Sequence, residues 1–297
     1  LNTSFKKVAD KYLNRYHEAL GMLGIPSSAA DIIEPKASTY IGKMIEFING
    51  LISKGVAYQS EGDVYFDIKK ANNYGKLSNQ SLGHMEVGAR IAPGEKKRDP
   101  LDFALWKNAK EGEPFWDSPW GKGRPGWHIE CSVMSSDILG DEFDIHGGGI
   151  DLIFPHHENE KAQSEGAGKN FARYWVHHGL LTINAQKMSK SLGNFVTVND
   201  FLAKYHYPEL LKLFFLGAHY SHPIDYTETK IEEARQALER IVILADKLGG
   251  RCSKGAEEGD SGTRQNPELI DIENRFMAAM DDDFNTPEAL AQLFELV

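Results

Sequence analysis

The sequence is poor in cysteine and lacks any long apolar run. Its 297 residues include two cysteines, Cys131 and Cys252, too few for a disulfide framework, which fits a reducing compartment. No stretch approaches the roughly 20 apolar residues that a membrane-spanning helix needs. The first residues also lack the pattern of a signal peptide. These absences predict a cytoplasmic protein with no membrane partner.

Basic residues are outnumbered by acidic ones, 33 to 43, which gives a net charge of −10. This balance disfavours a protein that coats nucleic acid indiscriminately, so any RNA contact should be local. The length, with 41% hydrophobic and 26% charged residues, indicates a globular chain of two or three domains. Because Leu1 is not an initiator residue, we expect further sequence upstream.

Apolar spacing predicts the main elements of the chain. Helices are expected over 5–24 and 39–54, a hairpin over 56–68, and another helix over 126–139. Trp106, Trp116 and Trp120 are expected to pack a small module between the hairpin and that helix, with a nucleic-acid stacking platform as the alternative. Beyond residue 199 the pattern is mostly helical, with a capping box predicted at Thr229 and Glu232. The first part therefore reads as α/β and the last third as a helical bundle.

The stretch DIHGGGIDLIFPHHENE, residues 144–160, combines a strand end, three glycines and a helix start. We expect Gly147–Gly149 to form a turn and Pro155 to begin the helix. His156 and Glu160 would then share one helix face, and Cys131 upstream could add a thiolate. Cys, His and Glu together suit zinc better than magnesium or calcium. A solvated ion pair and a buried cysteine are the alternative at this point.

A second motif, KMSKS at 187–191, places Lys187 and Lys190 in a loop that contains Ser and Gly. Two flexible cationic side chains can close over a polyphosphate and offset the charge that develops as pyrophosphate leaves. A solvated basic loop is the alternative, but the five-residue match followed by Leu192-Gly193-Asn194 disfavours it.

Four long strings resemble the cysteinyl-tRNA synthetases, which are class I aminoacyl-tRNA synthetases. They are GRPGWHIECS at 123–132, DIHGGGIDLIFPHHENE at 144–160, KMSKSLGNF at 187–195 and MDDDFNTPEA at 280–289. The resemblance covers nearly the whole chain. It implies a monomer that activates L-cysteine with ATP, bound as its Mg complex, and transfers the cysteine to tRNA-Cys with the help of one zinc per chain.

The same resemblance implies a Rossmann-type α/β catalytic core with an inserted connective module, followed by an α-helical bundle. On this basis we divide the chain into five segments. They are part of the core at 1–34, the connective insertion at 35–125, the second half of the core at 126–180, the KMSKS loop and stem-contact region at 181–225, and a truncated helical bundle leading to the anticodon-binding region at 226–297.

The resemblance also implies roles for individual residues. The family's zinc takes two cysteines, a histidine and a glutamate, and three positions match: Cys131, His156 and Glu160. The cysteine substrate would meet Trp127 and His146, whose structural alternatives are a core indole and a packing imidazole. The nucleotide would be bound by Gly148, Gly149, Asp151 and Lys190. Lys187 and Lys190 would be the catalytic cations. Asp151 is nearly as well explained as a capping carboxylate.

Two features of the family are missing from these residues. The HIGH signature and the second zinc-binding cysteine are absent, and Cys252 lies in the helical end, where it cannot replace that cysteine. We therefore expect a fragment that is not a competent enzyme alone. Two alternatives stay open: a cysteine ligase with an amino-sugar acceptor, and a non-catalytic, zinc-stabilised RNA-binding module.

Overall fold

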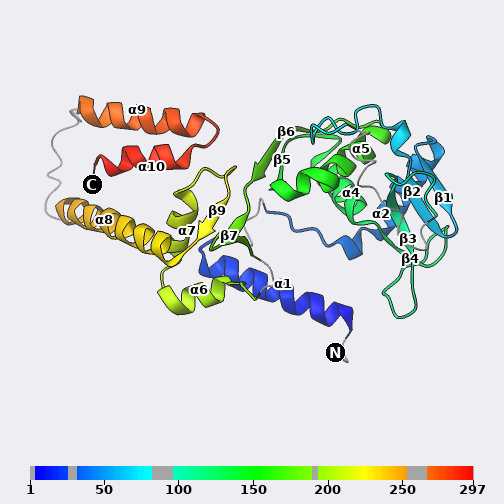
Figure 1. The fold of residues 1–297 in the computed structure, drawn as a ribbon, viewed down its shortest axis with the longest axis horizontal. Coiled ribbons are helices and arrows are strands. Elements are labelled where there is room, and N and C mark those ends of the chain that lie inside the picture. Colours follow the sequence, from blue (N-terminus) through cyan, green and yellow to red (C-terminus); the bar gives the residue numbers. More distant parts are fainter. Residues whose placement is uncertain (1–3, 26–31, 82–95, 189–192, 253–265, 297) are drawn as a thin grey trace. The chain divides into compact units, whose positions relative to one another are not determined.

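The computed structural model describes residues 4–25, 32–81, 96–188, 193–252 and 266–296 (Figure 1). Its contacts divide the chain into two compact units. We call Ala30–His177 the central unit, and Leu1–Ala29 together with His178–Val297 the helical unit. The five-segment division expected from the sequence is a finer one and stays a prediction.

An antiparallel sheet with the strand order β1-β2-β3-β4 forms one part of the central unit. Its strands are β1 (Ala57–Ser60), β2 (Asp63–Phe66), β3 (Phe103–Asn108) and β4 (Gly123–Pro125). Helix α2 (Ile41–Ser53) buries Met44, Ile48 and Leu51 in the same apolar core. Short 3₁₀ turns occupy Ala37–Thr39 and Ile68–Lys70. The predicted helix and hairpin are both confirmed.

The tryptophans of this module pack its core, as predicted. Trp106 is wholly buried, and its ring centroid lies 5.7 Å from that of Trp120, while Trp116 packs partly buried against the same cluster. Helix α4 (Trp127–Leu139) follows β4 directly and confirms the helix predicted there. The residue before it, Gly126, lies so close to β3 that an added Cβ would meet the carbonyl oxygen of Ala104 at 2.0 Å.

Strands β5 (Glu142–Gly149) and β6 (Phe171–His178) form a separate two-stranded sheet. The predicted turn at Gly147–Gly149 is wrong, because the three glycines lie within β5. The missing side chains permit close packing instead. A Cβ on Gly147 would lie 3.2 Å from the carbonyl oxygen of Val176, and one on Gly148 would lie 2.8 Å from Cε1 of His157.

The helical backbone that leads into α5 begins at Pro155, as predicted, but its first turn is π-helical. A 3₁₀ turn (Ile150–Leu152) and a π-helical turn (Ile153–His157) come first, and helix α5 spans Glu158–Gly166. The Phe154–Pro155 peptide is cis, and Phe154 is extended, with φ −133° and ψ 131°. Phe154 interrupts the helical backbone because a residue that precedes proline is pushed out of the α region, and the residues after it are helical up to the end of α5. Helices α4 and α5 pack against each other.

The helical unit contains a three-stranded sheet of order β8-β7-β9. Its elements are α1 (Phe5–Met22), β7 (Leu181–Ile183), β8 (Gln186–Lys187), α6 (Val198–Tyr205), α7 (Pro208–Leu216), β9 (Ile224–Tyr226), α8 (Glu228–Cys252), α9 (Pro267–Asp281) and α10 (Thr286–Phe294). Its core gathers Phe201, Leu210, Leu211, Phe214 and Ile231. Within the described ranges, no helix has both the length and the apolar character of a membrane span.

The predicted capping box at Thr229 and Glu232 is wrong in position. Helix α8 begins at Glu228, and the hydroxyl oxygen of Thr227 accepts a hydrogen bond from the Lys230 backbone at 3.2 Å. Thr227 therefore caps the helix, because it is the last residue outside it with a side-chain acceptor.

Candidate metal centre

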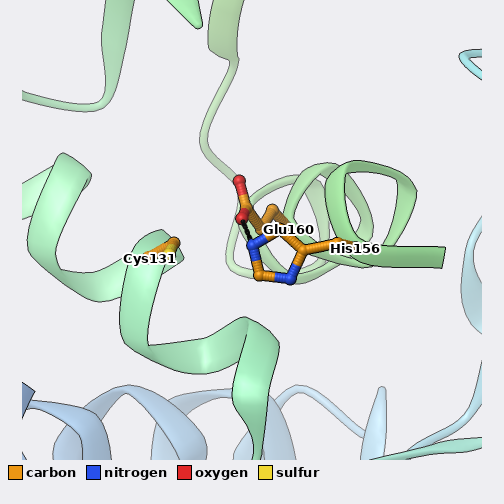
Figure 2. A group of neighbouring side chains, drawn as sticks. All are labelled: Cys131, His156 and Glu160. Carbon is orange, nitrogen blue, oxygen red and sulfur yellow. Dashed lines mark ion pairs between the residues drawn. The ribbon is translucent and has the colours of Figure 1, made fainter. Parts of the chain in front are cut away.

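The three ligands predicted from the sequence converge in the central unit. Cys131 comes from α4, His156 from the π-helical turn and Glu160 from α5 (Figure 2). One potential ligand atom of each lies within 4.8 Å of those of the other two. Ligand atoms around a single tetrahedral zinc lie roughly 3.3–3.8 Å apart, given bond lengths of about 2.0–2.3 Å. Small side-chain movements would therefore close this group around one ion.

The carboxylate of Glu160 is wholly buried and faces two imidazoles. Its Oε1 lies 2.5 Å from Nε2 of His156, and its Oε2 lies 2.8 Å from Nε2 of His146. Each oxygen of the carboxylate is thus paired with one imidazole nitrogen. Burial acts to raise the pKa of Glu160, but the two imidazoles outweigh it and hold that pKa at about 2. An enclosed anionic carboxylate is costly unless a cation offsets it, which fits a metal ligand.

The thiol of Cys131 is mostly enclosed beside the same carboxylate. Burial, and then the negative charges of Glu160 and Glu130, raise the pKa of Cys131 to about 12. Without a cation this cysteine would stay protonated at neutral pH. A bound metal ion reverses that preference, because it stabilises the thiolate directly.

Further aromatic side chains surround the group: His157 was expected beside the ligands as a supporting residue, whereas His128 and His177 were not predicted from the sequence. Nδ1 of His128 lies 2.8 Å from Nδ1 of His156, and Nδ1 of His157 lies 2.8 Å from Nε2 of His177. Burial lowers the pKa of both His128 and His157 to about 4, so both are neutral at pH 7. Neutral imidazoles in contact with ligand residues orient them, as outer partners commonly do in metal sites.

The positions of His128 and His177 in the sequence do indicate which face of their element they occupy. His128 precedes Cys131 by three residues, so the two share a face of α4. His177 follows Trp175 by two residues, so both lie on one side of β6, and their rings stack with centroids 6.1 Å apart. What the sequence alone could not supply was the packing that brings β6 against His157.

Polar contacts of the neighbouring residues fix the two helices that carry the ligands. The wholly buried Ser132 donates a hydrogen bond to Oε1 of Gln163 at 2.6 Å, which joins α4 to α5. Glu158 accepts a hydrogen bond from the Ser78 backbone at 2.8 Å, and Asn159 accepts one from Tyr74 at 2.6 Å. Of the sequence Glu-Asn-Glu, the first two residues thus anchor a loop, and Glu160 alone faces the imidazoles.

The remaining predicted residues of the central unit lie on β5, on the 3₁₀ turn after it and at the start of α4. His146 meets Glu160, and the ring of Trp127 lies 4.5 Å from that of His156 with 59% of the residue exposed. Gly149 is buried at the end of β5, and Asp151 is exposed in the 3₁₀ turn that follows. The structure brings Trp127 and His146 to the rim of the metal group.

The predicted cationic loop belongs to the helical unit. Lys187 is exposed on β8, and its carbonyl oxygen accepts a hydrogen bond from the side chain of Asn194 at 3.2 Å. Lys190 lies outside the described residues.

Comparison with known proteins identifies two matching families. A family described as the catalytic domain of class I (C) tRNA synthetases matches residues 1–236, and the DALR domain matches residues 275–297. The cysteine–tRNA ligase of Persephonella marina is 52% identical over 294 residues, which cover 99% of this chain and 59% of that protein. That of Geobacillus thermodenitrificans is 52% identical over 297 residues, which cover 100% and 63%. The chain thus spans about three fifths of these curated relatives.

Solved structures show the same fold at low sequence identity. Mycobacterium tuberculosis methionyl-tRNA synthetase in complex with methionyl-adenylate is 14% identical, with a TM-score of 0.69, and the match covers 99% of this chain and 70% of that one. A putative arginyl-tRNA synthetase from Campylobacter jejuni, also 14% identical, gives a TM-score of 0.56 over 97% and 58% of the two chains. Together with the family match, these similarities confirm the predicted class I synthetase fold.

Proposed function

The chain belongs to the family of class I (C) tRNA synthetase catalytic domains, and on this premise we propose that the protein containing it activates L-cysteine with ATP and transfers the cysteine to tRNA-Cys. The observation that carries the proposal is the convergence of Cys131, His156 and Glu160. A site of this chemistry suits a substrate that bears a thiol. The names of the two relatives, both cysteine–tRNA ligases, support the same reading.

Zinc is the metal that these three residues fit best, because thiolate, imidazole and carboxylate are its usual protein ligands. The buried carboxylate of Glu160, whose negative charge lies among imidazoles, supports a cation at this place. When bound, zinc supplies a soft Lewis acid that prefers a thiolate to a hydroxyl group. Such a preference is valuable here, because a pocket that relies on shape alone discriminates poorly between near-isosteric substrates such as cysteine and serine.

The chain's own residues would position the reactants. Trp127 and His146 flank the metal group and would enclose the amino acid, which excludes water from the reacting carboxylate. Gly149 and Asp151 would meet the adenylate, with Asp151 on the ribose hydroxyls. Gly148 would let the nucleotide approach, although the close contact with His157 gives this glycine a packing role as well.

The two lysines of the KMSKS sequence would act on ATP, bound as its Mg complex. Lys187 and Lys190 are proposed to contact the phosphates and to offset the charge that grows as pyrophosphate leaves. Lysine suits this role because its flexible point charge can be withdrawn when the loop opens.

The acceptor is proposed to be tRNA and not an amino sugar. The DALR match at 275–297 supports this choice, because a small sugar acceptor gives no use for an added helical domain of the tRNA synthetases. A localised tRNA contact also agrees with the net charge of −10. We further propose that the protein acts as a monomer in the cytoplasm, where its few cysteines stay reduced.

The direct test uses the whole protein that contains this chain. We expect cysteine-dependent exchange of pyrophosphate with ATP, cysteinylation of tRNA-Cys, and one zinc per chain by elemental analysis. Cys131→Ser should lose the zinc and most of the exchange, since it removes the thiolate ligand. The matched control is Cys252→Ser, which should change neither quantity. A protein without cysteine-dependent exchange would support the non-catalytic alternative, and equal zinc contents in the two variants would remove Cys131 from the site.

A further inference from the structure

A second group of potential ligands lies beside the first and shares one residue with it. His146 from β5, His157 from the π-helical turn and Glu160 from α5 each offer a ligand atom, and these atoms lie within 4.8 Å of one another. Glu160 divides its oxygens between the two groups: Oε1 faces His156, and Oε2 faces His146 at 2.8 Å. Two donor sets thus meet at one carboxylate, and all of their residues belong to the central unit.

The residues of this second group are buried and are held by neighbouring side chains, which distinguishes the group from a chance cluster on the surface. Glu160 is fully buried, His157 is 2% exposed and the side chain of His146 is 17% exposed. Oε2 of Glu160 is enclosed and faces the ring nitrogen of His146. His157 is held from outside through His177, which is the arrangement that orients imidazoles in metal sites.

The donor chemistry limits which ions would fit. Two imidazoles and one carboxylate oxygen suit zinc, cobalt, nickel or copper, whereas magnesium and calcium prefer oxygen ligands alone. A carboxylate that connects two ions is a common arrangement in proteins that hold two metals. The first group differs in one respect that can be measured, since it contains the only thiolate of the two sets.

We propose that His146, His157 and Oε2 of Glu160 form a second position for a zinc-class cation, which fills when the metal is in excess and inhibits the enzyme. The inhibitory part rests on the proposed function, in which His146 borders the amino-acid pocket. In the proposed function, His146 contacts the amino-acid substrate. An ion bound to His146 would prevent that contact. The metal that selects cysteine would then, in excess, also block its binding.

Titration of the metal-free whole protein with Co²⁺ tests the site without relying on activity. The first equivalent should produce the near-ultraviolet charge-transfer band of a cobalt–thiolate bond, which Cys131 supplies. A second equivalent should raise the visible d–d absorption and leave the thiolate band unchanged, because its ligands are nitrogen and oxygen. Saturation after one equivalent would overturn the proposal, and so would a single ion that merely exchanges between the two groups.

Variants assign the second equivalent to these residues. His157→Gln should weaken binding of the second cobalt by about 10–100-fold and keep the thiolate band of the first. The matched control is His128→Gln, which alters a buried imidazole on the side of His156 and should leave the second equivalent in place. If His157→Gln does not fold, His146→Asn serves for the same metal titration. A second equivalent that persists in the folded variant overturns the assignment.

Inhibition of the zinc-loaded enzyme by further zinc is an independent measurement of the second site. Excess zinc should slow cysteine-dependent pyrophosphate exchange in the wild type, and His157→Gln should need about 10–100-fold more zinc for the same loss. Failure of the second site would leave the first thiolate band and the exchange activity intact. Failure of the proposed function would remove the exchange itself, so the two failures are distinguishable.

Discussion

At the scale of single residues, Glu160 determines what the site can do. Within the described residues this fully buried carboxylate contacts both His146 and His156. A neutral side chain of the same size would fill the same space, so the property that matters is the negative charge. That charge fits a cation, and in the proposed metal site it would set how strongly the bound cation attracts a further thiolate.

Glu160→Gln therefore separates selectivity from stability. We expect the preference for cysteine over serine in amino-acid activation to fall by about 10–100-fold, because a changed metal shell weakens thiolate binding while serine barely engages the metal. Activation kinetics with both amino acids, beside a thermal melt, provide the measurement. Glu165→Gln on the same helix, where Glu165 pairs with Lys161, is the control and should change neither. Equal losses for both amino acids together with a lowered melting temperature would mean that the metal serves only the fold.

At the scale of elements, the site depends on how α4 and α5 are held. Local patterns predicted the helices and the hairpin because apolar spacing and glycine stops are properties of a few neighbouring residues. The start of the helical segment at Pro155 was predicted from proline's preference for the first helical position, but its π-helical first turn was not. The place of Gly147–Gly149 was missed, because a glycine required by packing against Val176 and His157 looks the same in sequence as a glycine in a turn.

The start of α4 gives a stability prediction at this scale. Gly126→Ala should lower the free energy of unfolding by about 1–3 kcal/mol, because the new methyl group would meet the Ala104 carbonyl at 2.0 Å. Gly50→Ala is the matched control: Gly50 lies inside α2 with nothing within 4 Å of an added Cβ, so the same change should stabilise the protein by about 0.5–1 kcal/mol. Denaturant titration of both variants measures the difference, and equal effects would contradict the close packing at Gly126.

Across the whole molecule, metal ligands that lie far apart in the sequence were easier to predict than the side chains that pack around them. Cys131 and Glu160 could be paired from their donor types and from the family resemblance, although other segments lie between them. His128 and His177 could not, because their role depends on the packing of α4 and β6 around the same imidazoles. The roles of Lys187 and Lys190 stay predictions, as does the five-segment division of the chain.

In the proposed function, the metal at Cys131, His156 and Glu160 contacts the substrate thiol. X-ray absorption at the zinc edge, recorded on the whole protein with and without L-cysteine, reports this contact. We expect one additional sulfur neighbour at zinc–thiolate distance, about 2.3 Å, when cysteine is added, and no change when serine is added. An unchanged number of sulfur neighbours at saturating cysteine would mean that the metal does not bind the substrate.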